Sequence, residues 1–117
     1  MCKQKVLSHN EHGYVVLCKN CQHYHIAFGT TVLSLSEIQY EEFKSQAQEQ
    51  FNFHKDDAFP QQKVIQLPTF STNVIMVLSF NELLKLIELI EEANILNQVD
   101  KLIYKAETKA QTQNNNT

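Results

Sequence analysis

Apolar and polar residues alternate with a period of two in the first third of the chain, which predicts extended strands. The alternating runs are rich in β-branched and aromatic residues and cover residues 3–8, 14–18, 23–28 and 31–35. Gly13 and Gly29 lie between runs, where a reversal of the chain favours a residue that can take positive φ. The pattern therefore predicts a β-meander.

After Ser36 the apolar spacing changes to three and four residues, which indicates a helix. Ser36 and Gln39 fit a capping box at its start. The apolar face of this helix consists of Tyr40, Phe43, Ala47 and Phe51. A polar loop is predicted over residues 54–62, followed by two strands at 63–67 and 73–80. The run Val74–Leu78 is apolar on both faces, as is typical of a central strand.

A second helix is predicted from about Phe80, with Ser79 and Glu82 as its capping box. Its apolar positions between Leu83 and Ile103 cover more than one core-facing stripe, so the rest of the fold or a second copy must bury the surplus. We therefore expect a homodimer that forms through the Leu83–Ile103 helix. The polar, low-complexity sequence of residues 105–117 predicts a frayed or disordered tail.

These elements predict an α+β fold with a single domain over residues 1–104. It would have a small antiparallel sheet, two helices packed on one side and a zinc-knuckle-like N-terminal hairpin. The chain has 117 residues, of which 43% are apolar and 20% charged, as expected for one globular domain with its own core.

Composition also excludes several classes of function. The net charge is -3 and arginine is absent, which argues against a nucleic-acid surface. No apolar stretch is long enough for a membrane span or placed as a secretory leader, so we expect a cytoplasmic protein without membrane contacts. Glycine-rich phosphate loops and Gly-flanked serine nucleophiles are missing, so no catalytic residue is predicted and a non-enzymatic role is favoured.

The sharpest chemical motif is Cys18-Lys19-Asn20-Cys21, because two thiolates separated by two residues can point at one zinc ion. A hairpin that turns around Asn10-Glu11 would set Cys2 opposite Lys19 and add a third thiol. His23 and His25 share a strand face with Cys21, and His23 is nearer the turn. The predicted ligands of a structural zinc are Cys2, Cys18, Cys21 and His23.

Two alternatives remain for these cysteines. A CxxC pair can be a thiol redox site, although the predicted strand after Cys21 leaves no helix to activate the thiol. The cysteines can also be inert, buried as small apolar residues in an adaptor whose partner the sequence does not name.

The order of several short motifs resembles a family of short uncharacterised bacterial proteins, known only as a domain of unknown function. The motifs are Met1-Cys2, "HGY", "CKNC", "AFGTTVLSL", "LPTFSTN" and "LSFNELLKLIELIEEA". The resemblance spans residues 1–104 and implies a complete, stand-alone protein. It implies no activity, ligand or catalytic residue.

Overall fold

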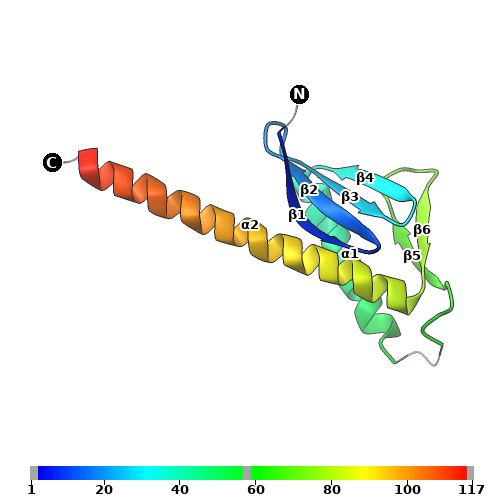
Figure 1. Cartoon of the computed structure of the whole chain (residues 1–117). Coiled ribbons are helices and arrows are strands. Elements are labelled where there is room, and N and C mark those ends of the chain that lie inside the picture. The colour runs from blue at the N-terminus through cyan, green and yellow to red at the C-terminus, as the bar shows by residue number, and fades with distance from the viewer. Residues whose placement is uncertain (1–2, 57–58, 116–117) are drawn as a thin grey trace.

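The computed structural model describes residues 3–56 and 59–115, with side chains through residue 107. The elements are β1 (Gln4–Asn10), β2 (Gly13–Cys18), β3 (His23–Phe28), β4 (Thr31–Leu35), α1 (Glu37–His54), β5 (Ile65–Pro68), β6 (Ile75–Leu78) and α2 (Phe80–Asn115). Strands β1 to β4 form one antiparallel meander, and β5 pairs with β6 in a separate hairpin (Figure 1). The α+β fold, with both helices against one face of the larger sheet, is confirmed.

The strand pair β5–β6 differs from the prediction of a central strand at Val74–Leu78. It forms a sheet of its own with two strands, so each strand has an open edge. Burial alternates along β6, with Met76 and Leu78 buried but Ile75 and Val77 exposed. The prediction was wrong because an apolar run can satisfy one buried face and still leave its other face in water.

The register of the β1–β2 hairpin differs from the predicted one by one residue at the knuckle end and by two residues at the turn end. Gln4 pairs with Cys18, and a bulge between Val6 and Ser8 shifts the ladder. The turn is closed by the Asn10 side chain, whose Oδ1 accepts the backbone N–H of His12 at 2.8 Å. The extra residue of the bulge is a feature that hydrophobic alternation alone does not reveal.

Both predicted capping boxes are confirmed. In α1 the Ser36 hydroxyl accepts the Gln39 N–H at 3.2 Å, and the Gln39 side chain accepts the Ser36 N–H at 3.1 Å. In α2 the Ser79 hydroxyl accepts the Glu82 N–H at 3.1 Å, and Glu82 accepts the Ser79 N–H at 2.9 Å. Each pair satisfies backbone donors that a helix start leaves without partners, so both helix starts are defined locally.

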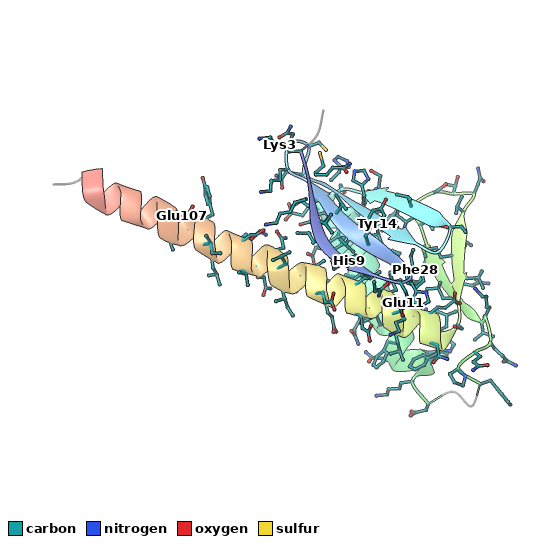
Figure 2. All side chains as sticks on the ribbon, in the orientation of Figure 1. Lys3, His9, Glu11, Tyr14, Phe28 and Glu107 are labelled. Atoms are coloured by element: carbon teal, nitrogen blue, oxygen red, sulfur yellow. The ribbon has the colours of Figure 1, made fainter. Side chains whose placement is uncertain are left out.

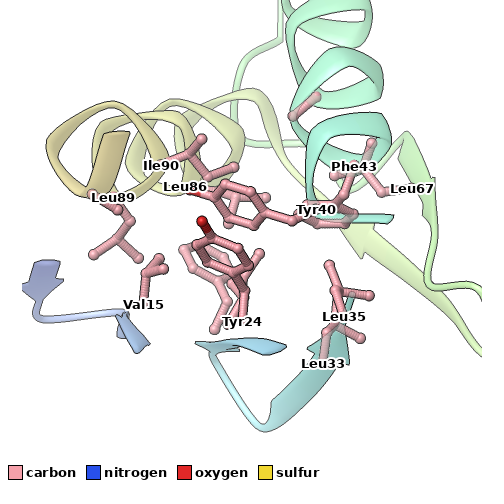
Figure 3. Close-up of a cluster of buried hydrophobic side chains, with 14 of the residues drawn as sticks. Val15, Tyr24, Leu33, Leu35, Tyr40, Phe43, Leu67, Leu86, Leu89 and Ile90 are labelled. Atoms are coloured by element: carbon pink, nitrogen blue, oxygen red, sulfur yellow. The ribbon is translucent and has the colours of Figure 1, made fainter. Parts of the chain in front are cut away.

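The core lies between the inner face of the meander and the two helices (Figure 3). The helices contribute Tyr40, Phe43 and Ala47 from α1 and Leu83, Leu86, Leu89, Ile90 and Ala93 from α2. Polar contacts also join α2 to the first strand: the buried Ser8 hydroxyl donates to the Leu89 carbonyl at 2.6 Å, the Asn10 side-chain amide donates to the Lys85 carbonyl at 3.3 Å, and Lys5 pairs with Asp100. The last helix therefore packs against the first strand.

The helix α2 is longer than its packing partners. It continues through residues 105–115, the segment whose composition predicts a frayed tail, and it projects beyond the sheet (Figure 1). Every residue from Lys101 to Glu107 is exposed. The molecule consequently measures 64 × 31 × 24 Å.

Two stacked tyrosines in the core differ in how their hydroxyls are satisfied. The rings of Tyr24 and Tyr40 lie 4.1 Å apart, centroid to centroid. The Tyr24 hydroxyl accepts the side-chain N–H of Asn97 at 3.0 Å. The buried Tyr40 hydroxyl has no hydrogen-bond partner among the described residues. A buried hydroxyl without a partner costs free energy, so Tyr40 is a weak point of the core.

We expect Tyr40→Phe to raise the free energy of unfolding by about 1 kcal/mol, because it removes an unsatisfied hydroxyl and keeps the ring. Burial raises the pKa of Tyr40 above its ordinary value of 10.0, so the unfolded chain loses this proton first as pH rises. The higher pKa in the folded chain keeps its full contribution to the free energy of unfolding below about pH 10. This contribution is lost as the pH rises above 10 toward the pKa of the folded state. Between pH 7 and pH 10.5, the free energy of unfolding measured in urea should therefore fall less for Tyr40→Phe than for the wild type.

The matched control is Tyr24→Phe, which loses the hydrogen bond from Asn97. It is expected to lower the free energy of unfolding by about 1 kcal/mol at pH 7. A higher free energy of unfolding for Tyr40→Phe together with a lower one for Tyr24→Phe would support the conclusion that, of these two hydroxyls, Tyr40 is the one without a hydrogen-bond partner. Equal losses in both would contradict it.

Candidate metal-binding knuckle

The Cys18–Cys21 motif forms the tight turn that joins β2 to β3. The Gln22 N–H donates to the Cys18 carbonyl at 2.9 Å and closes the turn. Gln22 takes a φ of 58°, in the left-handed region, where zinc knuckles often carry glycine. Its side chain donates to the Lys19 carbonyl at 2.8 Å, so a hydrogen bond within the turn helps to hold this conformation.

The two cysteine sulfurs converge across the turn. Their Sγ atoms lie 2.8 Å apart, with Cys18 buried and Cys21 exposed. Thiolates on one tetrahedral zinc lie roughly 3.8 Å apart, given Zn–S distances of about 2.3 Å, so a small opening of the pair would admit the ion. Cys18 is also disulfide-bonded in the structure. The turn therefore brings together sulfur atoms that can serve either metal or disulfide chemistry.

The knuckle lies on the outer face of the sheet. Val15 and Leu17 point into the core, so by the period of two the neighbouring Cys18 faces the opposite side from the helices. In the ladder Cys18 is flanked by Gln4 on β1 and His23 on β3. Figure 2 shows sulfur atoms close to the labelled Lys3, at the end of the sheet away from Glu11. The exposed Cys21 end of the motif is therefore accessible from solvent, and the motif is separate from the helical core.

His23, the predicted fourth ligand, pairs with Cys18 across the β2–β3 ladder. Its Nδ1 lies 2.9 Å from the Cys21 carbonyl oxygen. A carbonyl only accepts, so a hydrogen bond here places the proton on Nδ1 and leaves a lone pair on Nε2. Histidines that bind metal usually have their second nitrogen oriented by such a backbone carbonyl. In the Nδ1–H tautomer, the exposed His23 ring would present Nε2 to a metal ion.

The other histidines are placed differently. His25 lies on the same face two residues further along β3, where it is half-buried opposite Val16. His12 stacks on Phe28 with ring centroids 5.5 Å apart, at the far end of the sheet from the knuckle. His12 is therefore remote from the cysteine pair.

Cys2 lies outside the described residues. The described residue next to Cys2 in sequence is Lys3. Its carbonyl accepts a hydrogen bond from the Lys19 N–H at 3.0 Å, which holds residue 3 beside the knuckle. Within residues 3–56 and 59–115, no group of three or more His, Cys, Asp or Glu side chains is close enough to hold a metal ion. The four-ligand site remains a prediction, and the described residues supply the Cys18–Cys21 pair and the aligned His23.

Sequence reasoning did not find the groove of about 630 Å³ between α1 and α2. Its rim carries the ion pair of Lys44 with Glu41, at 2.8 Å, and side chains such as Gln48 and Asn94 complete it. Such residues are ordinary on solvent-facing helices, so no sequence signal distinguishes them. We assign the groove no chemistry.

The described helices include none that is both long and apolar enough to cross a membrane.

The fold and the knuckle define a class of protein: a small α+β domain with a cysteine pair at one end of an antiparallel sheet. The chain belongs to a family of unknown function (DUF6686), whose model matches residues 1–115. This confirms the resemblance to a domain of unknown function. No curated protein and no solved structure matches the chain.

Proposed function

We propose that this protein is a small, non-enzymatic metal-binding module, in which Cys2, Cys18, Cys21 and His23 hold one structural zinc ion. The observation that carries the proposal is the convergence of the Cys18 and Cys21 sulfurs, 2.8 Å apart in a tight turn. Three thiolates and one imidazole are a common ligand set for structural zinc. Four protein ligands leave no position for a reactive water, so the role would be structural rather than catalytic.

The location of the knuckle suggests what the ion would stabilise. Lys19 holds the backbone of Lys3, the residue next to Cys2 in sequence. A zinc ion shared by Cys2 and the Cys18–Cys21 turn would therefore anchor the N-terminus to the β2–β3 connection. His23 would add the first residue of β3 to the same anchor.

One observation favours a second candidate function, thiol–disulfide exchange. Cys18 is disulfide-bonded, and the Cys21 sulfur lies within attacking range of it. The Cys21 thiolate would attack Cys18 Sγ, form a Cys18–Cys21 disulfide and release the sulfur previously bonded to Cys18 as a thiolate. Against this stands the element after Cys21, which is strand β3, whereas redox CxxC motifs lie at the N-terminus of a helix.

The metal content of the reduced protein distinguishes the two functions. Protein purified with a phosphine reductant and without chelator is expected to carry about one zinc per chain, because structural sites bind zinc tightly. Cys18→Ser and Cys21→Ser are expected to retain less than about 0.1 equivalent, since each removes a thiolate. Elemental mass spectrometry measures the zinc, and circular dichroism confirms that each variant is folded.

The matched control for the imidazole ligand is a second exposed histidine on the same sheet. His23→Ala should weaken zinc binding by at least about tenfold in a chelator competition, whereas His9→Ala should leave it unchanged. Less than about 0.1 equivalent of zinc in the reduced wild type contradicts the metal proposal. A zinc-free protein with a reversible Cys18–Cys21 disulfide would establish the exchange function instead.

A further inference from the structure

The projecting part of α2 lacks the packing that stabilises the rest of the helix. Residues 101–107 are all exposed, and Figure 2 shows Glu107 far beyond the sheet. Helices in water gain most of their stability from burying an apolar face, and short unsupported helical segments are marginal. A partner along this segment would provide the missing burial.

An apolar stripe on α2 leads into this segment. Ile95, Val99 and Leu102 are 62%, 43% and 66% exposed, and their spacing of four and three residues is that of a coiled-coil seam. At 100° per residue, the stripe lies about 160° around the helix from the core-facing positions Leu86 and Ala93. The stripe is therefore accessible while α2 remains packed in its own core.

The charges beside the stripe indicate how a second helix would be oriented. Glu91 and Lys105 lie seven residues before and after Gln98, so all three occupy the same flank. In an antiparallel pair centred near Gln98, Glu91 faces Lys105 of the second copy, and the twofold symmetry repeats this contact. In a parallel pair in register, this flank of one helix would lie on the opposite side of the seam from the same flank of its partner, so Glu91 would not meet Lys105.

We infer that the protein forms an antiparallel homodimer in which the Ile95–Val99–Leu102 stripe of α2 packs against the same stripe of a second copy. A twofold interface needs a self-complementary surface, and this stripe with its two charged ends has that property. This interface covers only part of the predicted Leu83–Ile103 helix. Leu83 and Leu86 cannot contribute to it, because both are fully buried within their own chain. It is independent of the proposed zinc site, which lies on the outer face of the sheet.

The first test replaces an apolar residue of the stripe with a charged one. Sedimentation equilibrium of the full chain at 5–500 µM is expected to give a dimer for the wild type and a monomer for Ile95→Glu. The control is Ile38→Glu, which changes another isoleucine on an exposed helix surface, 73% exposed on α1, and should remain dimeric. A wild type that stays monomeric at 500 µM overturns the inference, as does an Ile95→Glu dimer of unchanged Kd.

The second test concerns orientation. Glu91→Lys and Lys105→Glu should each raise the dimer Kd by about three- to tenfold, because each variant opposes like charges twice. The double variant should restore the wild-type Kd. Residues 91 and 105 are roughly 21 Å apart along one helix, so the rescue cannot arise within one chain. A double variant that binds no more tightly than the single variants excludes the antiparallel arrangement.

Discussion

Replacing Gly13 with alanine is expected to destabilise the protein by at least about 3 kcal/mol, a loss large enough to unfold many small domains. A Cβ atom on Gly13 would lie 1.7 Å from the carbonyl oxygen of Ala27 and 2.6 Å from its carbonyl carbon. Both atoms belong to the backbone of β3, which pairs with β2 at this point through Gly13 and Phe28. The substitution therefore requires the two strands to separate, and no side-chain rotation relieves the clash.

Gly29→Ala is the matched control, since it adds the same methyl group to the only other glycine. Gly29 has a φ of 60°, and a methyl group added there would enter open space, with no atom within 4 Å. Its substitution should cost only the backbone strain of an alanine in the left-handed region, about 1–2 kcal/mol. Urea unfolding of both variants measures the difference. Equal losses at the two positions would show that close packing at Gly13 is not the cause.

A second large effect is expected at the centre of the core. Phe43 is fully buried on α1, so Phe43→Ala should lower the free energy of unfolding by about 3–5 kcal/mol. The loss combines the apolar surface that is no longer buried with the cavity that the missing ring leaves. Thermal and urea unfolding of the purified variant would measure it.

Phe53→Ala provides the comparison for this prediction. Phe53 lies on the same helix but is 79% exposed, so its replacement should change the stability by no more than about 0.5 kcal/mol. A small loss for Phe43→Ala, or a comparable loss for Phe53→Ala, would contradict the assignment of Phe43 to the core.

Local patterns were sufficient to predict most elements of the fold. Capping boxes depend on residues three apart, so Ser36 with Gln39 and Ser79 with Glu82 were identifiable without tertiary information. The apolar spacing on α1 likewise predicted the buried positions Tyr40 and Phe43. These features are encoded within a few residues of the chain, and the structure confirms them.

Features that depend on distant parts of the chain were less accessible. The bulge between Val6 and Ser8 changes the strand register, and alternation alone does not reveal one extra residue. The separate β5–β6 sheet depends on which strands pair, which a run such as Val74–Leu78 does not specify.

The two glycines show the same limit. Both were expected to provide positive φ, but only Gly29 takes it among the described glycines. Gly13 is needed instead because the β3 backbone approaches it closely, and this approach exists only in the folded hairpin.

The candidate site was predicted in part. The spacing of Cys18 and Cys21 predicted that both thiols can point at one ion, and their sulfurs lie 2.8 Å apart. His23 was chosen because it is nearer the turn than His25, and its pairing with Cys18 across the ladder is a feature that only the structure provides. The part played by Cys2 stays a prediction. The left-handed Gln22 could not be anticipated from its residue type, since glycine or asparagine is the usual choice there.

The contact between the first strand and the last helix has a consequence for synthesis on the ribosome. The meander is complete once Leu35 has been made, but the α2 residues that cover it extend to Ala93. At about 5–20 residues per second, the intervening 58 residues delay closure of the core by about 3–12 s. During that interval the nascent chain exposes the apolar side of a nearly finished sheet, a surface that chaperones bind and that neighbouring nascent chains could join.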